Sequence, residues 1–149
     1  MNSFNETPTV TGQVTFTHKD AAGNIISEST VKNLVVTTGL EFIASRMVGT
    51  SKAVMSHMAL GESDTTPALG NTGLGAQLGS RVSLIGSSVT SNAITYTATF
   101  GAGVATGTVV EAGIFNASSS GDMLCRTVFP VINKLSTDSL AVTWVVTVN

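Results

Sequence analysis

Alternation of apolar and polar residues dominates the chain and is clearest in its C-terminal half. Residues 94–100 alternate strictly, and every second residue from Leu140 to Val148 is apolar. Side chains of a β-strand point to opposite faces in turn, so both segments predict strands with one buried face. The second segment carries Trp144, the one tryptophan of the chain, and is predicted to lie centrally in the core.

Further strands are predicted where apolar runs end at turn residues. Residues 10–17 and 25–36 flank the turn-forming stretch 20–24 and predict an opening hairpin. The other predicted strands are residues 53–60, 81–89, 108–116 and 123–131. About seven or eight short strands with threonine-rich faces indicate a mainly β fold, an antiparallel β-sandwich of jelly-roll type.

One short amphipathic α-helix is predicted at about residues 38–48. Its apolar residues recur at helical spacing and would form the buried face: Leu40, Ile43, Ala44 and Met47. Thr38 and Glu41 match a capping box, in which the two side chains satisfy free backbone N–H groups at the helix start. Gly49 follows where the helix would end.

The chain divides into a predicted N-terminal arm, residues 1–9, and a single β-sandwich domain, residues 10–149. The arm is polar and contains Pro8, so it contributes little to a core and is expected to be flexible when free. Within the domain, residues 61–79 are rich in Gly, Ser, Thr, Asp and Asn. A connection of this length is mobile or functional, and we interpret it as a surface arm that packs against a neighbour.

Charged residues make up only 11% of the 149 residues, against about 25% in ordinary domains. This shortage favours a surface that a partner covers. The net charge of −2, without a Lys/Arg cluster, argues against nucleic acid as a partner. Apolar stretches fall short of the ~20 residues of a spanning helix, and the first residues lack a secretory pattern, so we expect no membrane partner and cytosolic synthesis.

Candidate chemistry is sparse, so we expect no enzyme, no cofactor and no metal. His18 adjoins a turn and is interpreted as a surface residue, while His57 and the lone Cys125 lie in apolar segments and are interpreted as packed. Glu62 and Asp64 could hold a hard cation, but a solvated acidic turn is the preferred interpretation. Glycine patterns at 73–79 and 101–107 place the third glycine one residue too late for a dinucleotide fingerprint.

Three blocks of the C-terminal half resemble a recurrent module of tailed-bacteriophage structural proteins. They are residues 110–117 (VEAGIFNA), 123–129 (MLCRTVF) and 138–144 (DSLAVTW), preceded by similar segments at 58–62, 74–76 and 81–82. The resemblance covers about residues 58–148 and implies a virion structural protein, with no catalytic residue. The short chain favours a capsid cement or decoration protein on the capsid exterior, made in the host cytoplasm.

The implied partners are the major capsid protein and further copies of this chain as a homo-oligomer. A tail, baseplate or fibre component is the alternative. A carbohydrate-binding receptor module would need exposed aromatic residues, whereas Trp144 and Tyr96 lie in strand patterns that predict core positions. The candidate partner-binding residues come from the arm and the long loop: Phe4, Pro8, Glu62, Asp64, Pro67, Leu69 and Leu74.

Overall fold

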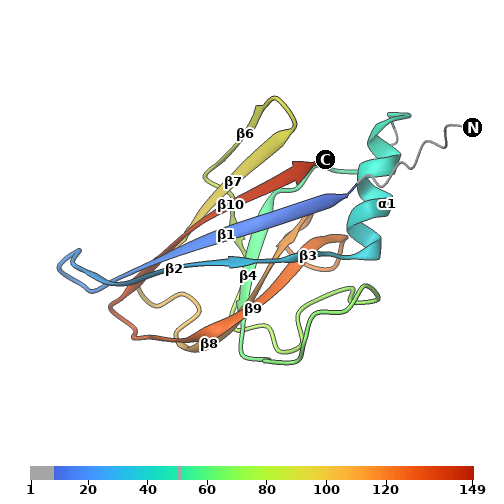
Figure 1. Ribbon diagram of the computed structural model, residues 1–149. Coiled ribbons are helices and arrows are strands. Elements are labelled where there is room, and N and C mark those ends of the chain that lie inside the picture. The colour runs from blue at the N-terminus through green and yellow to red at the C-terminus, as the bar shows by residue number, and fades with distance from the viewer. Residues whose placement is uncertain (1–8, 50–51) are drawn as a thin grey trace, which may run out of the picture.

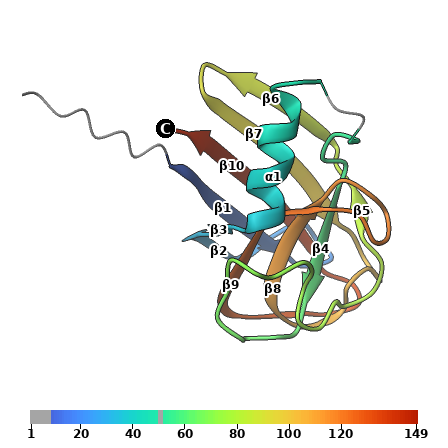
Figure 2. The same cartoon turned by 90° about the vertical axis from the view of Figure 1, so that its right-hand side faces the viewer.

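The computed structural model describes residues 9–49 and 52–149. In these residues two antiparallel five-stranded sheets face each other, and one short helix lies beside one end of the pair (Figures 1 and 2). The predicted mainly β sandwich with a single short helix is confirmed for the described part of the chain. Phe4 and Pro8 lie outside the described residues.

The first sheet has the order β2-β1-β10-β7-β6. Its strands are β1 (Val10–Lys19), β2 (Ile25–Lys32), β6 (Gly86–Thr90), β7 (Ala93–Phe100) and β10 (Ser139–Val148). Two hairpins, β1–β2 and β6–β7, form its two sides, and β10 joins them in the middle by pairing with β1 and β7.

The second sheet has the order β3-β9-β8-β4-β5. Its strands are β3 (Leu34–Val35), β4 (His57–Gly61), β5 (Val82–Ser83), β8 (Gly107–Phe115) and β9 (Met123–Lys134). The predicted strand 81–89 is therefore divided. Its first part belongs to the second sheet and its last part to the first, since the chain changes sheets between Ser83 and Gly86.

Trp144 is the centre of the core between the sheets, as the alternation of its strand predicts. It lies opposite Val14 of β1 and Tyr96 of β7, and none of its surface is exposed. Its indole N–H donates a hydrogen bond of 3.1 Å to Oδ1 of Asn33, so the one polar group of the side chain is satisfied. Phe16 packs near it against Phe129, with ring centroids 4.1 Å apart, and so joins the two sheets.

Helix α1 spans Thr37–Arg46, close to the predicted bounds, but it presents a different face to the core. Gly39 and Phe42 are buried, whereas Leu40, Ala44 and Met47 are exposed. The predicted burial of these three residues is wrong. The helix is rotated because it packs on β9 through Gly39, where a Cβ atom would collide with the carbonyl oxygen of Leu124.

The predicted capping box at the start of α1 is also wrong. Among the residues that the structure describes, no side chain caps this end of the helix. The hydroxyl of Thr38 instead donates a hydrogen bond of 2.8 Å to the carbonyl oxygen of Met123, and thereby ties the first turn to β9. Gly49 follows the helix with a positive φ of 66°, which agrees with its predicted role in ending it.

Candidate protein-interaction surface

The connection from β4 to β5, residues 62–81, covers the outer face of the second sheet (Figure 2). Every residue of β8 from Val109 to Phe115 is buried, although a strand with one solvent-exposed face would alternate. Leu74 of the connection packs on a small second core on this outer face, formed by Val36, Ala59, Phe115 and Met123. The connection is therefore a covering layer of its own sheet, which we call the covering loop.

Glu111, in the middle of β8, holds the covering loop in place. Its carboxylate is fully buried and accepts hydrogen bonds from the backbone N–H groups of Ser63 (3.2 Å), Gly75 (3.0 Å) and Ala76 (2.8 Å). These donors come from both ends of the loop. One side chain thus supplies the backbone partners that a loop without regular structure otherwise lacks.

Arg126 of β9 completes this buried polar cluster. Its Nε donates to Oε2 of Glu111 at 2.9 Å, and its Nη1 donates to the carbonyl oxygen of Thr65 (2.9 Å) and to Oδ1 of Asn71 (3.3 Å). Its Nη2 lies 2.9 Å from Oε2 of Glu111 as a charge contact, although no N–H of that atom is directed at an acceptor. The pair neutralises both charges and links the sheet to the middle of the loop.

The structure separates the predicted partner-binding residues of the covering loop into two groups. Glu62, Asp64 and Leu69 are exposed, and Leu69 keeps 55% of its surface free. Pro67 and Leu74 are half-buried, and Leu74 is directed at the chain's own second core. Partner binding by these residues stays a prediction. Of the two groups, the exposed residues Glu62, Asp64 and Leu69 are the ones that a partner could contact.

An apolar groove of about 460 Å³ runs between α1 and the first sheet. Phe42, Ile43 and Leu124 form one wall, and Ile94, Tyr96 and Val146 form the other. Val54, Val89 and Val148 lie at its rim and are 60%, 71% and 41% exposed. The two sheets do not close over each other here, so apolar side chains that a sandwich normally buries meet solvent.

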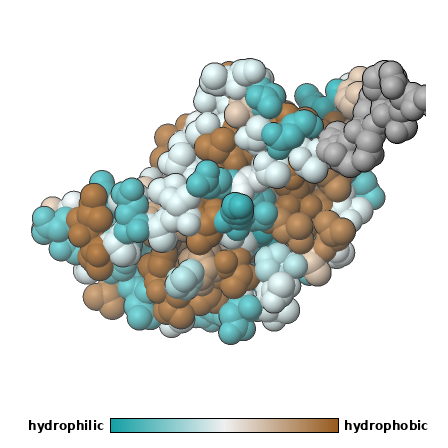
Figure 3. Space-filling view, in the orientation of Figure 1, coloured by the Kyte–Doolittle hydropathy of each residue, from teal (hydrophilic) through white to brown (hydrophobic). Residues whose placement is uncertain are grey.

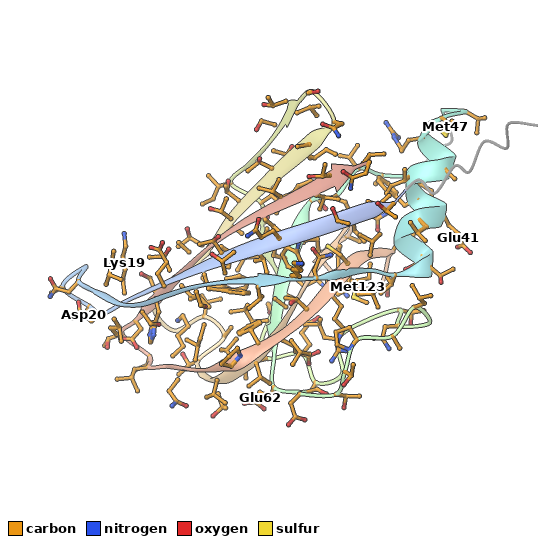
Figure 4. All side chains as sticks on the ribbon, viewed as in Figure 1. Lys19, Asp20, Glu41, Met47, Glu62 and Met123 are labelled. Atoms are coloured by element: carbon orange, nitrogen blue, oxygen red, sulfur yellow. The ribbon has the colours of Figure 1, made fainter. Side chains whose placement is uncertain are left out.

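The end of α1 adds further exposed apolar residues next to this groove. Met47 and Val48 are 86% and 80% exposed, and Figure 3 shows apolar surface gathered over the helix. Figure 4 places Met47 far from Glu62, whereas Leu69 of the covering loop lies at the other end of α1, where its carbonyl oxygen accepts the N–H of Thr37 at 2.9 Å. The sequence analysis missed this apolar surface because it assigned Met47 to the core. A usable signal is the absence of any charged residue from 82 to 110, the stretch that contains Ile94 and Tyr96 of one wall of the groove.

A second buried polar cluster lies near the tip of the β1–β2 hairpin. His18 is only 5% exposed, so its predicted surface position is wrong. Its Nε2 lies 2.9 Å from Oδ2 of Asp138, which also accepts the backbone N–H of Leu135 at 2.9 Å. Lys134 is buried beside them and donates to the carbonyl oxygen of Gly101 at 2.8 Å. His18 is buried because β10 and the turn before it fold back over the end of β1.

The hydrogen bond from the Leu135 N–H, together with His18 and Lys134, lowers the pKa of the Asp138 carboxyl below its usual value of 3.8. A carboxyl with a lowered folded pKa stabilises the fold above its unfolded pKa and loses that contribution as pH falls through the folded value. We therefore expect Asp138→Asn to lower the melting temperature at pH 6, with the difference from wild type shrinking below pH 4. Thermal melts from pH 2.5 to 6 measure this; a constant difference would contradict it.

Cys125 is fully buried in β9, as predicted, and burial raises the pKa of its thiol well above the usual value. Tyr96 is partly covered, and desolvation raises its pKa to about 12. Across residues 9–49 and 52–149, no three His, Cys, Asp or Glu side chains come together in a group that could hold a metal ion. The described residues contain no helix long and apolar enough to cross a membrane.

No protein-family model matches this sequence, and no curated protein or solved structure is significantly similar to it.

Proposed function

We propose that this chain is a non-enzymatic virion structural protein of a tailed bacteriophage. Its role is that of a capsid cement or decoration protein, which bridges subunits of the major capsid protein on the capsid exterior. The observation that carries the proposal is the exposed apolar surface beside α1. The segment resemblance at residues 58–148 supplies the virion context.

Exposed apolar residues at the α1 end favour a protein partner. Met47, Val48 and Val54 each leave more than half of their surface uncovered in a chain with only 11% charged residues. Large apolar patches on a folded domain commonly mark protein–protein contacts, because the removal of apolar surface from water is favourable. A capsid subunit that covers this surface would gain contact area without any chemistry.

The covering loop offers a second, preorganised contact surface. Glu111 and Arg126 fix its backbone from below, while Glu62, Asp64 and Leu69 project outward. A surface that is ordered before binding does not lose loop entropy on contact, so modest side-chain contacts contribute more to affinity. Two surfaces on one small domain suit a protein that bridges two neighbouring subunits.

The aromatic residues do not support a carbohydrate-binding role. Trp144 is fully buried and Tyr96 is half-buried in the wall of the groove. Phe16, Phe100 and Phe115 are also buried. Sugar rings stack on exposed aromatic faces, and these five residues offer little such surface.

Quantifying this chain in purified phage particles tests the proposal. A cement protein is expected in a copy number comparable with that of the major capsid protein, measured by mass spectrometry with labelled peptide standards. A copy number typical of a tail, baseplate or fibre would favour that alternative. Absence from the particle would overturn the virion assignment altogether.

Binding to particles that lack the chain tests the α1 surface directly. We expect Met47→Lys to weaken binding about tenfold or more, because it places a charge in an apolar contact. Leu135→Lys, at a residue that is also 63% exposed but lies near the hairpin tip, is the matched control and should bind normally. Equal binding by wild type and both variants would exclude α1 as the contact.

A further inference from the structure

β6 is an edge strand of the first sheet. It pairs with β7, and among the described residues no strand pairs with its other side. All five of its residues are exposed. Figures 1 and 2 show the β6–β7 hairpin extending beyond the neighbouring strands. A row of backbone N–H and C=O groups is therefore available to another strand.

β6 also lacks the features that normally protect an edge from pairing. Natural edge strands carry charged residues, prolines or bulges, or are covered by another segment. Residues 82–110 contain no charged residue, no histidine and no proline, and the β6–β7 register is regular. The opposite edge of the same sheet, β2, carries Glu28 and Lys32. Of the two edge strands of this sheet, β2 carries charged residues and β6 does not.

The sequence around β6 is compatible with antiparallel pairing to an identical strand. A two-fold axis at Ser87 would set Gly86 opposite Ser88 of a second copy, so small residues meet at the centre. It would also bring Val89 alongside Ile85 of that copy, and both residues are 71% exposed. The Ile85 N–H donates to the Thr97 carbonyl oxygen at 2.8 Å, so Ile85 would contribute its side chain, and not its N–H, to the contact with the second copy. Without charges on either strand, no like-charge repulsion opposes the pairing.

The apolar groove gives this pairing a second source of stability. Ser87 and Val89 belong to β6 and also line the groove. A second copy placed along β6 would bring its own groove next to the first across the two-fold axis, and the rim residue Val89 of each copy would lose solvent contact. Backbone pairing and apolar burial would then act at the same place.

We propose that a second copy of this chain is the partner of β6, and that two copies form a two-fold dimer in which their first sheets join into one continuous sheet. This inference concerns the isolated protein and goes beyond the proposed capsid role. If the dimer does not form, the proposed capsid role is unaffected, because the copy-number and particle-binding experiments test that role separately.

Cross-linking at the axis tests the geometry. Directly opposed residues of an antiparallel pair have Cα atoms about 4.5–5.5 Å apart, within the range that a disulfide spans. Cys125 is fully buried, so Ser87→Cys adds the one accessible thiol among the described residues. We expect this variant to form a covalent dimer under mild oxidation. Thr90→Cys is the matched control, because its two copies would lie about 20 Å apart in the paired strands.

Sedimentation equilibrium of the unmodified protein tests the dimer itself. We expect a concentration-dependent dimer, and a dimer dissociation constant raised about tenfold or more by Val89→Lys. Val131→Lys in β9, at a residue 56% exposed and away from β6, should leave the constant unchanged. Circular dichroism confirms that each variant folds. A wild-type monomer at all concentrations, an unaffected Val89→Lys dimer, or equal cross-linking of both cysteine variants would each overturn the proposal.

Discussion

Trp144→Ala is expected to lower the free energy of unfolding by about 3–5 kcal/mol. The side chain is fully buried between the sheets, and its strand β10 is bonded on both sides. Its removal leaves a cavity and also leaves Oδ1 of Asn33 without the indole N–H. Because domains are commonly stable by only about 5–15 kcal/mol, we expect a large fall in the midpoint of urea denaturation.

Two variants separate the causes of this loss. Trp144→Phe keeps much of the volume and removes only the hydrogen bond, so its loss should be clearly smaller. Thr143→Ala changes the next residue of the same strand, which is exposed, and should stay within about 0.5 kcal/mol of wild type. A Trp144→Ala midpoint close to that of Thr143→Ala would show that the core does not depend on this side chain.

Arg126→Met is expected to cost a similar amount, about 3–5 kcal/mol, for a different reason. The change leaves the buried Glu111 carboxylate without its cation and removes the donor to the Thr65 carbonyl oxygen. The loss should appear locally as well as globally. Hydrogen exchange at the Ser63, Gly75 and Ala76 amides, which bond to Glu111, should accelerate relative to amides in β10.

A charge-free double variant sharpens this test. Adding Glu111→Gln to Arg126→Met removes the unpaired buried charge, so the double variant should be more stable than Arg126→Met alone. Lys52→Met is the matched control, since it breaks the partly exposed 3.0 Å pair with Asp122 and should cost less than about 1 kcal/mol. If the double variant were the less stable of the two, charge burial would not be the source of the loss.

The sandwich and its central strand could be predicted because their pattern is local. Successive residues of β10 lie alternately in the core and on the other face of the sheet. Period-two alternation over nine residues indicates a β-strand with one buried face. The order of the strands could not be predicted in the same way. β10 lies between β1 and β7, and nothing in the alternation of one strand specifies its neighbours.

The helix shows where a pattern admits two interpretations. Leu40, Ala44 and Met47 have the spacing of a buried face, yet the core side is formed by Gly39 and Phe42. The deciding contact is the close approach of Gly39 to the Leu124 carbonyl, and this depends on β9, which lies more than 80 residues later in the chain. Periodicity alone cannot distinguish an apolar face that meets the core from one that meets a partner.

Composition predicts the covering loop only as a surface arm. In the structure its backbone is held by two side chains from distant strands, Glu111 and Arg126. Its Gly, Ser and Asn residues carry no periodic signal, so sequence reasoning could not place it on its own sheet. A usable signal did exist in the strands. Glu111 and Arg126 interrupt otherwise apolar segments, and a charge in a buried strand requires a partner of opposite charge or several hydrogen bonds.

The central position of β10 also determines the order in which the chain can fold during synthesis. All five strands of the second sheet precede Leu135, so none of the pairings within that sheet requires β10. Before β10 is in place, the first sheet consists of two separate hairpins, β1–β2 and β6–β7, and the inner edges of β1 and β7 are unpaired. Pairings between residues so far apart in sequence form slowly, and the nascent chain exposes these edges until they form. The pairing of Ser139–Val148 with both β1 and β7 is therefore the step that completes the first sheet.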